Sequence, residues 1–307
     1  MKKFILLIFF ISITGCRVCE FSKSKTPIEI LDISETQLRL ASQYLELNRD
    51  TWGIMMLDSL YKPFFNIWNP YIGNERQFLT SMHFEKKILL QKSIDKKNKL
   101  FMERLKKELH RKSKKMQEFT GYSTKGKWVL LYGSGSVDLG GFDDGTMLID
   151  LVNKATNNLD YISNMLPHEI NHLIYANTLK DKEGSSKVLH RIIGEGFACY
   201  VSYLFHEKKK EIYEELNYTE KEYLFCKKYE KGILQILKNT YQLNDEEIAI
   251  KLINRKHKYM NIYPGALGYY IGFRIVEEYV KKHGEDSWRD IYLMKPSEVL
   301  QKSGILK

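Results

Sequence analysis

The spacing of hydrophobic and polar positions changes near residue 121. From about residue 28 to residue 122, apolar side chains recur at the three- and four-residue spacing of amphipathic helices. Residues 75–116 carry apolar residues on one side of such a helix and many Lys and Arg on the other. The pattern predicts a helical accessory region over residues 28–120.

A short run of strand-forming residues opens the second half of the chain. Residues 127–132 read Lys-Trp-Val-Leu-Leu-Tyr, glycine-rich stretches follow, and residues 146–151 are again mostly apolar. Short apolar runs bounded by glycine predict two or three strands joined by turns. Beyond residue 151 the helical spacing returns. We therefore expect an α+β, mostly helical fold, in which residues 121–307 form one domain with a small β-sheet.

The N-terminus has the pattern of a lipoprotein signal peptide. Two lysines precede an apolar run that is too short to span a bilayer as a mature helix, and the run ends in Ile-Thr-Gly-Cys at residues 13–16. This ending resembles the bacterial lipobox, in which the Cys is lipidated and becomes the new N-terminus. The resemblance implies a signal peptide over residues 1–15, lipidation at Cys16 and a tether over residues 16–27.

The lipid would attach the protein to a membrane of the bacterial cell envelope, outside the cytoplasm. An uncleaved signal anchor and an ordinary signal peptide stay open as alternatives. So does the choice between the inner and the outer membrane.

The charge changes this picture little. The chain has 48 Lys and Arg against 38 Asp and Glu, for a formal net charge of +10. No glycine-rich phosphate loop, zinc-knuckle spacing or basic block with interleaved aromatic residues accompanies the charge. We expect solvated surface charge and no nucleic-acid partner. Contact of the basic run at residues 104–112 with anionic lipid is the alternative to a solvated helix face.

The sharpest chemical signal is His-Glu-Ile-Asn-His at residues 168–172. Residues four apart on a helix lie one turn above each other, so His168 and His172 can bind one zinc ion while Glu169 reaches the water on that ion. Asn164 can cap this helix, which would place Pro167 in the first turn, where its missing N–H does no harm.

A catalytic zinc site needs a third protein ligand and one open position. The best candidate is Glu195, on a second helix that Ser185 or Ser186 can cap and that runs to about residue 206. Glu195 and His172 lie at similar distances from the loop that connects the two helices, so that antiparallel packing brings them to the same depth. His190 as the ligand, or a structural role for Glu195, are the alternatives.

Two glycines flank Glu195 inside this helix, and each costs helix stability of about 1 kcal/mol relative to Ala. This cost suggests that another segment approaches the helix closely here.

These residues resemble the gluzincin metallopeptidases, in which two histidines of a short helical motif and a glutamate from a later helix bind zinc. Glu-Gly-Phe-Ala at 195–198 is similar to the string in aminopeptidase N-like enzymes. From about Trp128 to the C-terminus, the chain looks closer to a bacterial family of predicted zinc-dependent proteases. Residues 268–276 resemble that family's Gly-Tyr-x-x-Gly-Tyr helix, with Phe273 in place of the final Tyr.

The resemblance implies one Zn²⁺ ion held by His168, His172 and Glu195. Glu169 would take a proton from the zinc-activated water and later deliver it to the leaving amine. One turn after Glu195 stands Cys199, where several families with this arrangement place an acidic group that orients a ligand.

A further donor should stabilise the oxyanion that develops during hydrolysis. Because gluzincins often use a downstream Tyr or His, Tyr269 is the first candidate and Tyr270 the second. The alternative is that both rings only pack the core.

Residues 140–151 are a candidate edge strand along which gluzincins align an extended peptide. Gly140 and Gly141 would let that backbone approach closely, and a simple turn between strands explains them equally well. Cys199 and Cys226 lie in apolar helical surroundings and are expected to be buried free thiols, with a disulfide between them as the alternative.

The sequence thus predicts a membrane-tethered zinc metallopeptidase that cleaves a peptide or protein substrate. The alternative is an envelope lipoprotein that uses the same fold for binding or assembly, with the zinc structural or absent. A solute-binding lipoprotein with an accidental motif is a third possibility. Glu169 discriminates between these classes, because a structural zinc site needs no acid–base carboxylate beside its ligands.

Overall fold

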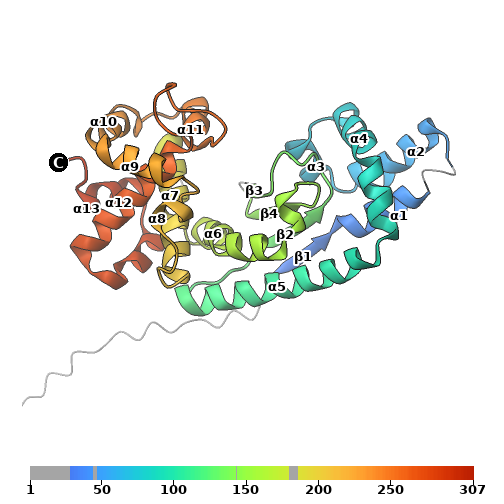
Figure 1. Cartoon of the computed structure of the whole chain (residues 1–307), viewed down its shortest axis with the longest axis horizontal. Helices are drawn as coiled ribbons and strands as arrows, with labels where there is room; N and C mark the ends of the chain where they lie inside the picture. Colours follow the sequence, from blue (N-terminus) through green and yellow to red (C-terminus); the bar gives the residue numbers. More distant parts are fainter. Residues whose placement is uncertain (1–27, 44–46, 143, 180–185) are drawn as a thin grey trace, which may run out of the picture.

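The computed structural model describes residues 28–43, 47–142, 144–179 and 186–307. The expected signal peptide and tether, including Cys16, lie outside these residues. The described part is α+β and mostly helical, as expected, with a small sheet between two groups of helices (Figure 1).

The first part of the described chain is one strand followed by helices. Its elements are β1 (Glu29–Asp32), α1 (Ile33–Ser42), α2 (Arg49–Met56), a π-helical turn (Leu57–Tyr61), α3 (Phe65–Tyr71), α4 (Glu75–Ile94) and α5 (Lys96–Thr120). The helical expectation is wrong at its start, where residues 29–32 form a strand. Four residues are too few to show a period, and β1 forms because it pairs with a strand far along the chain.

The amphipathic stretch that begins at residue 75 is divided at Asp95. This residue ends α4, and its side chain accepts a hydrogen bond of 2.9 Å from the backbone N–H of Lys97 in the first turn of α5. α5 ends at Gly121, whose φ of 81° lies in the left-handed region that glycine adopts without strain. Local capping therefore sets both ends of this long helix.

The sheet has the strand order β1-β2-β4-β3. Its other strands are β2 (Lys127–Leu131), β3 (Leu139–Gly141) and β4 (Thr146–Asp150). β2 pairs in parallel with both β1 and β4, and β3 pairs antiparallel with β4 at the edge. The strands expected between residues 127 and 151 are present, and the β1–β2 pair crosses the expected domain boundary at residue 121.

Both faces of the sheet are buried. Trp128 and Leu130 belong to a core cluster with side chains of α6, α7 and α12, whereas Val129 and Leu131 belong to a cluster with side chains of α1 to α4. Alternate residues of a strand point to opposite faces, so the two clusters lie on opposite sides of the sheet. The helices α1 to α4 therefore cover mainly one face, whereas α5 and the later helices, among them the one that carries the His-Glu-x-x-His motif, cover the other.

The helix that carries the motif, α6 (Leu159–Thr178), begins earlier than expected. Its N-cap is Asn158, whose side-chain oxygen accepts from two backbone N–H groups of the first turn, so the assignment of Asn164 as the cap is wrong. Pro167 consequently lies inside the helix. Ile162, in the part of α6 that precedes Asn164, is fully buried in the core, so the turns before the motif also pack against the rest of the protein.

The later helices lie together at one end of the molecule, and α6 lies between them and the sheet (Figure 1). They are α7 (Lys187–Phe205), α8 (Ile212–Glu215), α9 (Glu220–Lys228), α10 (Glu230–Thr240), α11 (Glu246–Ile253), α12 (Leu267–His283), a 3₁₀ segment (Glu285–Leu293) and α13 (Pro296–Ser303). Ser186 caps α7 by accepting from the backbone N–H of Leu189 at 3.1 Å. Ser185, the other candidate cap, lies outside the described residues.

α7 and α12 cross in direct backbone contact. A Cβ on Gly196 would lie 2.1 Å from the carbonyl carbon of Gly272, and one on Gly272 would lie 2.0 Å from the carbonyl oxygen of Ile192. The close approach predicted from the glycines beside Glu195 is confirmed for Gly196. At Gly194 a Cβ would meet nothing within 4 Å, and this residue lines a cavity instead.

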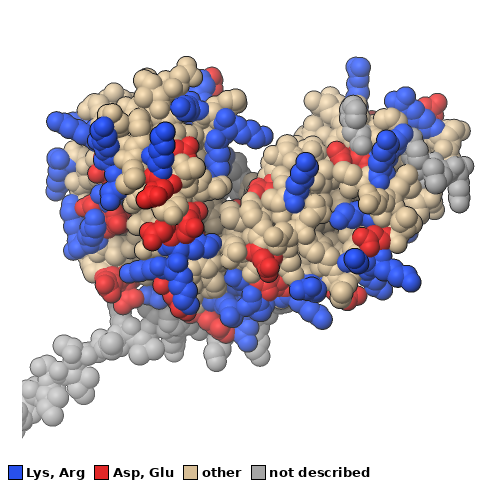
Figure 2. All heavy atoms as spheres, in the orientation of Figure 1, with Lys and Arg blue, Asp and Glu red and all other residues tan. Residues whose placement is uncertain are grey.

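In the described residues, no helix combines the length and the apolar composition needed to cross a membrane. Figure 2 shows Lys and Arg side chains interspersed with Asp and Glu over the visible face.

Candidate metal centre and active-site cavity

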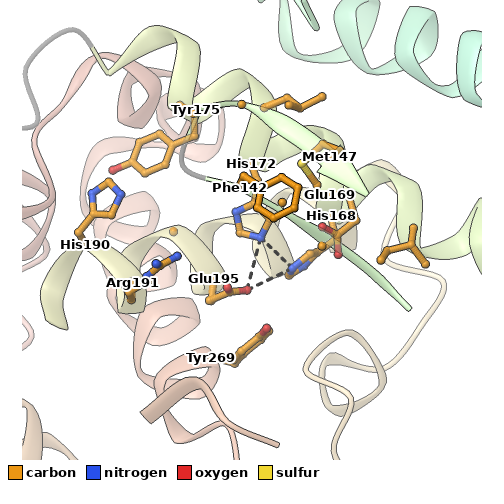
Figure 3. Close-up of a pocket in the computed structure, with 17 residues that line it drawn as sticks. Phe142, Met147, His168, Glu169, His172, Tyr175, His190, Arg191, Glu195 and Tyr269 are labelled. Carbon is orange, nitrogen blue, oxygen red and sulfur yellow. Dashed lines mark hydrogen bonds and ion pairs between the residues drawn. The ribbon is translucent and has the colours of Figure 1, made fainter. Parts of the chain in front are cut away.

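Three side chains from two helices meet at the centre of the candidate site (Figure 3). His168 and His172 project from α6, and their Nε2 atoms lie 3.1 Å apart. Oε2 of Glu195, on α7, lies 3.3 Å from Nε2 of His168 and 3.4 Å from Nε2 of His172. The sequence analysis predicted this convergence from the four-residue spacing and from the packing of the two helices.

The geometry of these atoms fits a zinc ion. Ligand atoms at 2.0–2.1 Å from a tetrahedral zinc lie about 3.3 Å from one another, which is close to the observed separations. Oε2 of Glu195 is buried and has no hydrogen-bond partner among the described residues, so it is an acceptor that a cation would satisfy. No other group of three His, Cys, Asp or Glu side chains within residues 28–43, 47–142, 144–179 and 186–307 is arranged to hold a metal.

The electrostatics of the three residues also favour a cation between them. Burial raises the pKa of Glu195, but the neighbouring imidazoles of His172 and His168 outweigh this effect and hold that pKa well below its usual value. Burial lowers the pKa of His172, and the neighbouring Glu195 carboxylate raises it by more. The site therefore holds an ionised carboxylate that stabilises positive charge beside it.

Glu169 is buried in the same cavity, with 8% of its surface exposed. In Figure 3 it lies on the other side of the two imidazoles from Glu195. Desolvation raises its pKa, and the nearby histidines counter this effect only in part. A carboxyl group whose pKa is raised above its usual value holds a proton more readily, which suits a group that must accept a proton and return it.

The cavity in front of the histidines has a volume of about 220 Å³. Gly140 and Gly141 of β3 line it on one side. Among the described residues, β3 pairs only with β4 and is an edge strand of the sheet. An unpaired strand edge is the kind of surface to which an extended peptide can add by main-chain hydrogen bonds. Gly141 also has a local reason to be glycine, because a Cβ there would lie 2.7 Å from Sδ of Met147 on β4.

Tyr269, at the start of α12, lies at the cavity beside the metal centre. Its ring is nearly parallel to the imidazole of His168, with an interplanar angle of 5° and a centroid distance of 6.0 Å. Burial and the charge of Glu195 raise its pKa well above the usual value, so the hydroxyl stays protonated and can donate. The guanidinium of Arg255 covers the ring at 4.2 Å, a contact that the sequence analysis missed.

Tyr270, the second candidate, is not brought to the site. It is almost fully buried, and its hydroxyl donates to Oε1 of Glu230 at 3.1 Å. Consecutive residues on a helix point about 100° apart, which explains why only one of the two adjacent tyrosines can face the metal centre.

The partner of His168 behind the metal centre is a thiol. Sγ of Cys199 lies 3.7 Å from Nδ1 of His168 and donates to the carbonyl oxygen of Glu215 at 3.4 Å. Burial raises the pKa of Cys199 well above its usual value, so the thiol stays protonated. The neutral thiol can accept from the imidazole N–H, at a position where several families with this arrangement place an acidic group. Cys199 and Cys226 are both buried free thiols, as predicted.

His190, the alternative third ligand, does not belong to the cluster of three ligands. It lines the cavity nearer the N-terminus of α7, and its ring stacks against that of Tyr175 at a centroid distance of 6.4 Å. Arg191 and Tyr175 line the same end of the cavity, and the sequence analysis assigned no role to either. The sequence did contain a signal for Arg191: it stands four residues before Glu195, and residues at this spacing lie on the same face of a helix.

Comparisons with known proteins agree with this site. Residues 100–301 match a family described as "Predicted Zn-dependent protease (DUF2268)". The match begins inside α5, earlier than the expected resemblance, and it includes His168, His172 and Glu195. Searches of curated proteins and of solved structures returned no significant match. Because the family match covers well over half of the 307 residues, the chain belongs to this family of predicted Zn-dependent proteases.

Proposed function

We propose that this protein is a zinc metallopeptidase of the gluzincin type, in which one zinc ion is held by His168, His172 and Glu195. The observation that carries the proposal is the convergence of these three ligand atoms at separations of 3.1 to 3.4 Å in a cavity that also contains Glu169. A purely structural zinc site is normally closed by four protein ligands, whereas three ligands beside an open cavity are typical of a catalytic site.

Around the three metal ligands, Glu169, Tyr269 and the edge of β3 each take a role in peptide hydrolysis. When bound, zinc supplies a Lewis acid that polarises the scissile carbonyl and lowers the pKa of a water toward about 7. Glu169 takes the proton of the attacking water and later gives it to the leaving amine. Tyr269 donates a hydrogen bond to the oxygen on which negative charge develops. The free edge of β3, at Gly140 and Gly141, aligns the extended substrate by main-chain hydrogen bonds.

We also propose that the enzyme acts in the bacterial cell envelope, tethered through a lipid on Cys16. The support is the lipobox-like ending of the N-terminal apolar run. Replacement of Cys16 by Ser should abolish incorporation of labelled fatty acid and release the protein from the membrane fraction. Incorporation of the label into the Cys16→Ser variant would contradict the tether.

The purified full chain should contain one equivalent of zinc and cleave members of a peptide library. In the Glu169→Gln variant we expect the zinc content to be retained and kcat to fall by at least about 10²-fold, because the general base is removed and the ligands are not. In the His172→Ala variant the zinc content itself should fall. Metal analysis by mass spectrometry and cleavage followed by product mass spectrometry measure both quantities.

Asp160→Asn is the matched control for the base, because Asp160 is an exposed carboxylate on the same helix. Its activity should equal that of the wild type. Equal activity in wild type and Glu169→Gln would refute the assigned base. Stoichiometric zinc without cleavage of any peptide would favour the non-catalytic lipoprotein.

A further inference from the structure

The cavity continues past the metal ligands to a second group of polar side chains. Arg191 and His190 of α7 and Tyr175 of α6 line the same cavity as Glu195. Figure 3 shows these three residues on the side of the site away from Glu169. None of them has a role in binding zinc or in moving the proton, so this end of the cavity needs an explanation of its own.

The charge of this end is opposite to that of the metal end. Arg191 is the one lysine or arginine among the described residues that line the cavity, whereas the carboxylates of the lining belong to Glu169 and Glu195. Nη2 of Arg191 contacts Oε1 of Glu246 at 3.4 Å, with side chains 38% and 42% exposed. An ion pair so open to water is weak. The planar guanidinium carries five N–H donors and matches a carboxylate in a bidentate manner.

Besides the Arg191 guanidinium, the Tyr175 hydroxyl also points to a bound ligand at this end of the cavity. It is only 3% exposed, and its hydroxyl oxygen is buried without a hydrogen-bond partner in the part of the chain that the structure describes. Buried polar groups are normally hydrogen-bonded. The Tyr175 hydroxyl can therefore donate a hydrogen bond to an acceptor group of a ligand in the cavity. The ring of His190 lies alongside, with an interplanar angle of 15° to the tyrosine ring.

The distance from Arg191 to the proposed zinc ligands determines which residue of a bound substrate would contact Arg191. Arg191 and Glu195 are four residues apart on α7, so their side chains project from the same face about 6 Å apart along the helix axis. An extended peptide advances about 3.3 Å per residue. A group one or two residues from the scissile bond would therefore meet Arg191.

We propose that Arg191, with Tyr175 and His190, forms a carboxylate-binding subsite that makes the peptidase selective for an acidic group one or two residues from the scissile bond. The carboxylate can be the C-terminus of a short peptide or the side chain of an internal Asp or Glu, because both present the same two oxygens. This inference rests on the proposed function and names the class of substrate that the peptidase would prefer.

The test begins with the cleavage positions found in the peptide library. Two matched peptide pairs are then made: one pair ends in a free carboxylate or an amide, and the other carries Glu or Gln near the scissile bond. The wild type should cleave at least one acidic member with a kcat/KM about 10- to 100-fold higher than its neutral partner, as expected for a hydrogen-bonded charge pair. The pair that shows the preference identifies the source of the carboxylate.

In the Arg191→Gln variant this ratio should fall to within about threefold of one, mainly through KM, because the charge that recognises the acidic member is gone. Tyr175→Phe should lower the ratio and leave the thermal stability of the free protein equal or higher, because the lost hydroxyl has no partner there. The matched control is Lys187→Gln, since Lys187 also contacts Glu246, at 3.6 Å, but does not line the cavity. Its ratio should equal that of the wild type.

Binding provides a readout that is independent of catalysis. Fluorescence anisotropy of the labelled peptides with the Glu169→Gln full chain should show tighter binding of the acidic member, and the difference should vanish in the Glu169→Gln/Arg191→Gln double variant. Glu169-dependent cleavage with equal kcat/KM for both members of both pairs would overturn the subsite and leave the proposed function intact. A wild type that binds the acidic member selectively through Arg191 but cleaves nothing would overturn the proposed function alone.

Discussion

At the scale of single residues, the two adjacent tyrosines of α12 lie in different surroundings. Tyr269 lies at the metal centre with its hydroxyl protonated, whereas Tyr270 is buried with its hydroxyl bound to Glu230. Both were candidates from the sequence, and only Tyr269 lines the cavity, because a helix can direct only one of two neighbours to a given point.

We expect Tyr269→Phe to lower kcat about 10²-fold with little change in KM, since an oxyanion donor acts chiefly in the transition state. Zinc content should not change. Tyr270→Phe is the matched control: its kcat should equal that of the wild type, and its unfolding free energy should fall by about 1 kcal/mol with the loss of one hydrogen bond. Steady-state kinetics and urea unfolding measure these effects, and a normal kcat for Tyr269→Phe would contradict the assigned role.

Glu215 supports the metal centre from behind. Its carbonyl accepts from Cys199, and its buried side chain contacts His206 at 2.8 Å and accepts from Ser202 at 2.8 Å. Burial raises the pKa of Glu215, but these hydrogen bonds and the charge of Lys210 together lower it below its usual value. A carboxyl with a lowered folded-state pKa stabilises the fold above its unfolded pKa of about 4.3 and loses that contribution as the pH falls.

The Glu215→Gln variant should therefore unfold with a free energy about 2 kcal/mol lower than the wild type at pH 7. The difference should shrink as the pH is lowered through 4 toward 3. Urea unfolding of both proteins across this range is the measurement. A difference that stays constant with pH would show that the carboxylate charge is not the cause.

At the scale of secondary-structure elements, the crossing of α7 and α12 positions Glu195. Gly196 follows this ligand directly and allows the backbone of α12 to touch α7, whereas Gly194 faces the cavity. The sequence indicated a close approach from the cost of two glycines in a helix, but it did not distinguish their roles.

Gly196→Ala should destabilise the protein by about 2 kcal/mol, because overpacking at a rigid backbone contact outweighs the higher helix propensity of alanine. Gly194→Ala, with open space for its Cβ, should stabilise the protein by up to about 1 kcal/mol. Thermal and urea unfolding compare the two variants. Equal effects of both substitutions would show that the close contact does not limit the packing of the helices.

At the scale of the whole molecule, the sheet joins the N-terminal helices to the metal-site helices. Adjacent residues of β2 belong to two core clusters on opposite faces, and β1 brings the start of the described chain into the same sheet. The N-terminal helices and the helices of the candidate metal site therefore share this central sheet, although their patterns of hydrophobic positions differ.

This shared sheet predicts one cooperative unfolding transition, with coincident midpoints for far-UV circular dichroism, Trp fluorescence and peptidase activity. Leu131→Ala, on the face toward α1 to α4, should cost about 2 to 5 kcal/mol and shift all three midpoints equally. Loss of activity at a denaturant concentration where the fluorescence is unchanged would indicate two independent units.

Much of the candidate site follows from the sequence because its signals are local. The spacing of His168 and His172 on one helix face, the caps of α7 and the strand-forming run before the glycines depend on the backbone geometry of a few neighbouring residues. The position of Glu195 required one further step, the packing of two consecutive helices across a short connection.

Only the tertiary structure decided the remaining features, because each depends on segments distant in the chain. β1 is too short to show a period and forms through its pairing with β2. The first turns of α6, which begins at Leu159, include Ile162, which is buried in the core. The thiol beside His168, the guanidinium over Tyr269 and the polar end of the cavity at Arg191 arise where separate helices meet. Hydrophobic periodicity specifies which face of a helix is buried, but not which partner it will contact, since that choice is made by the packing of the whole core.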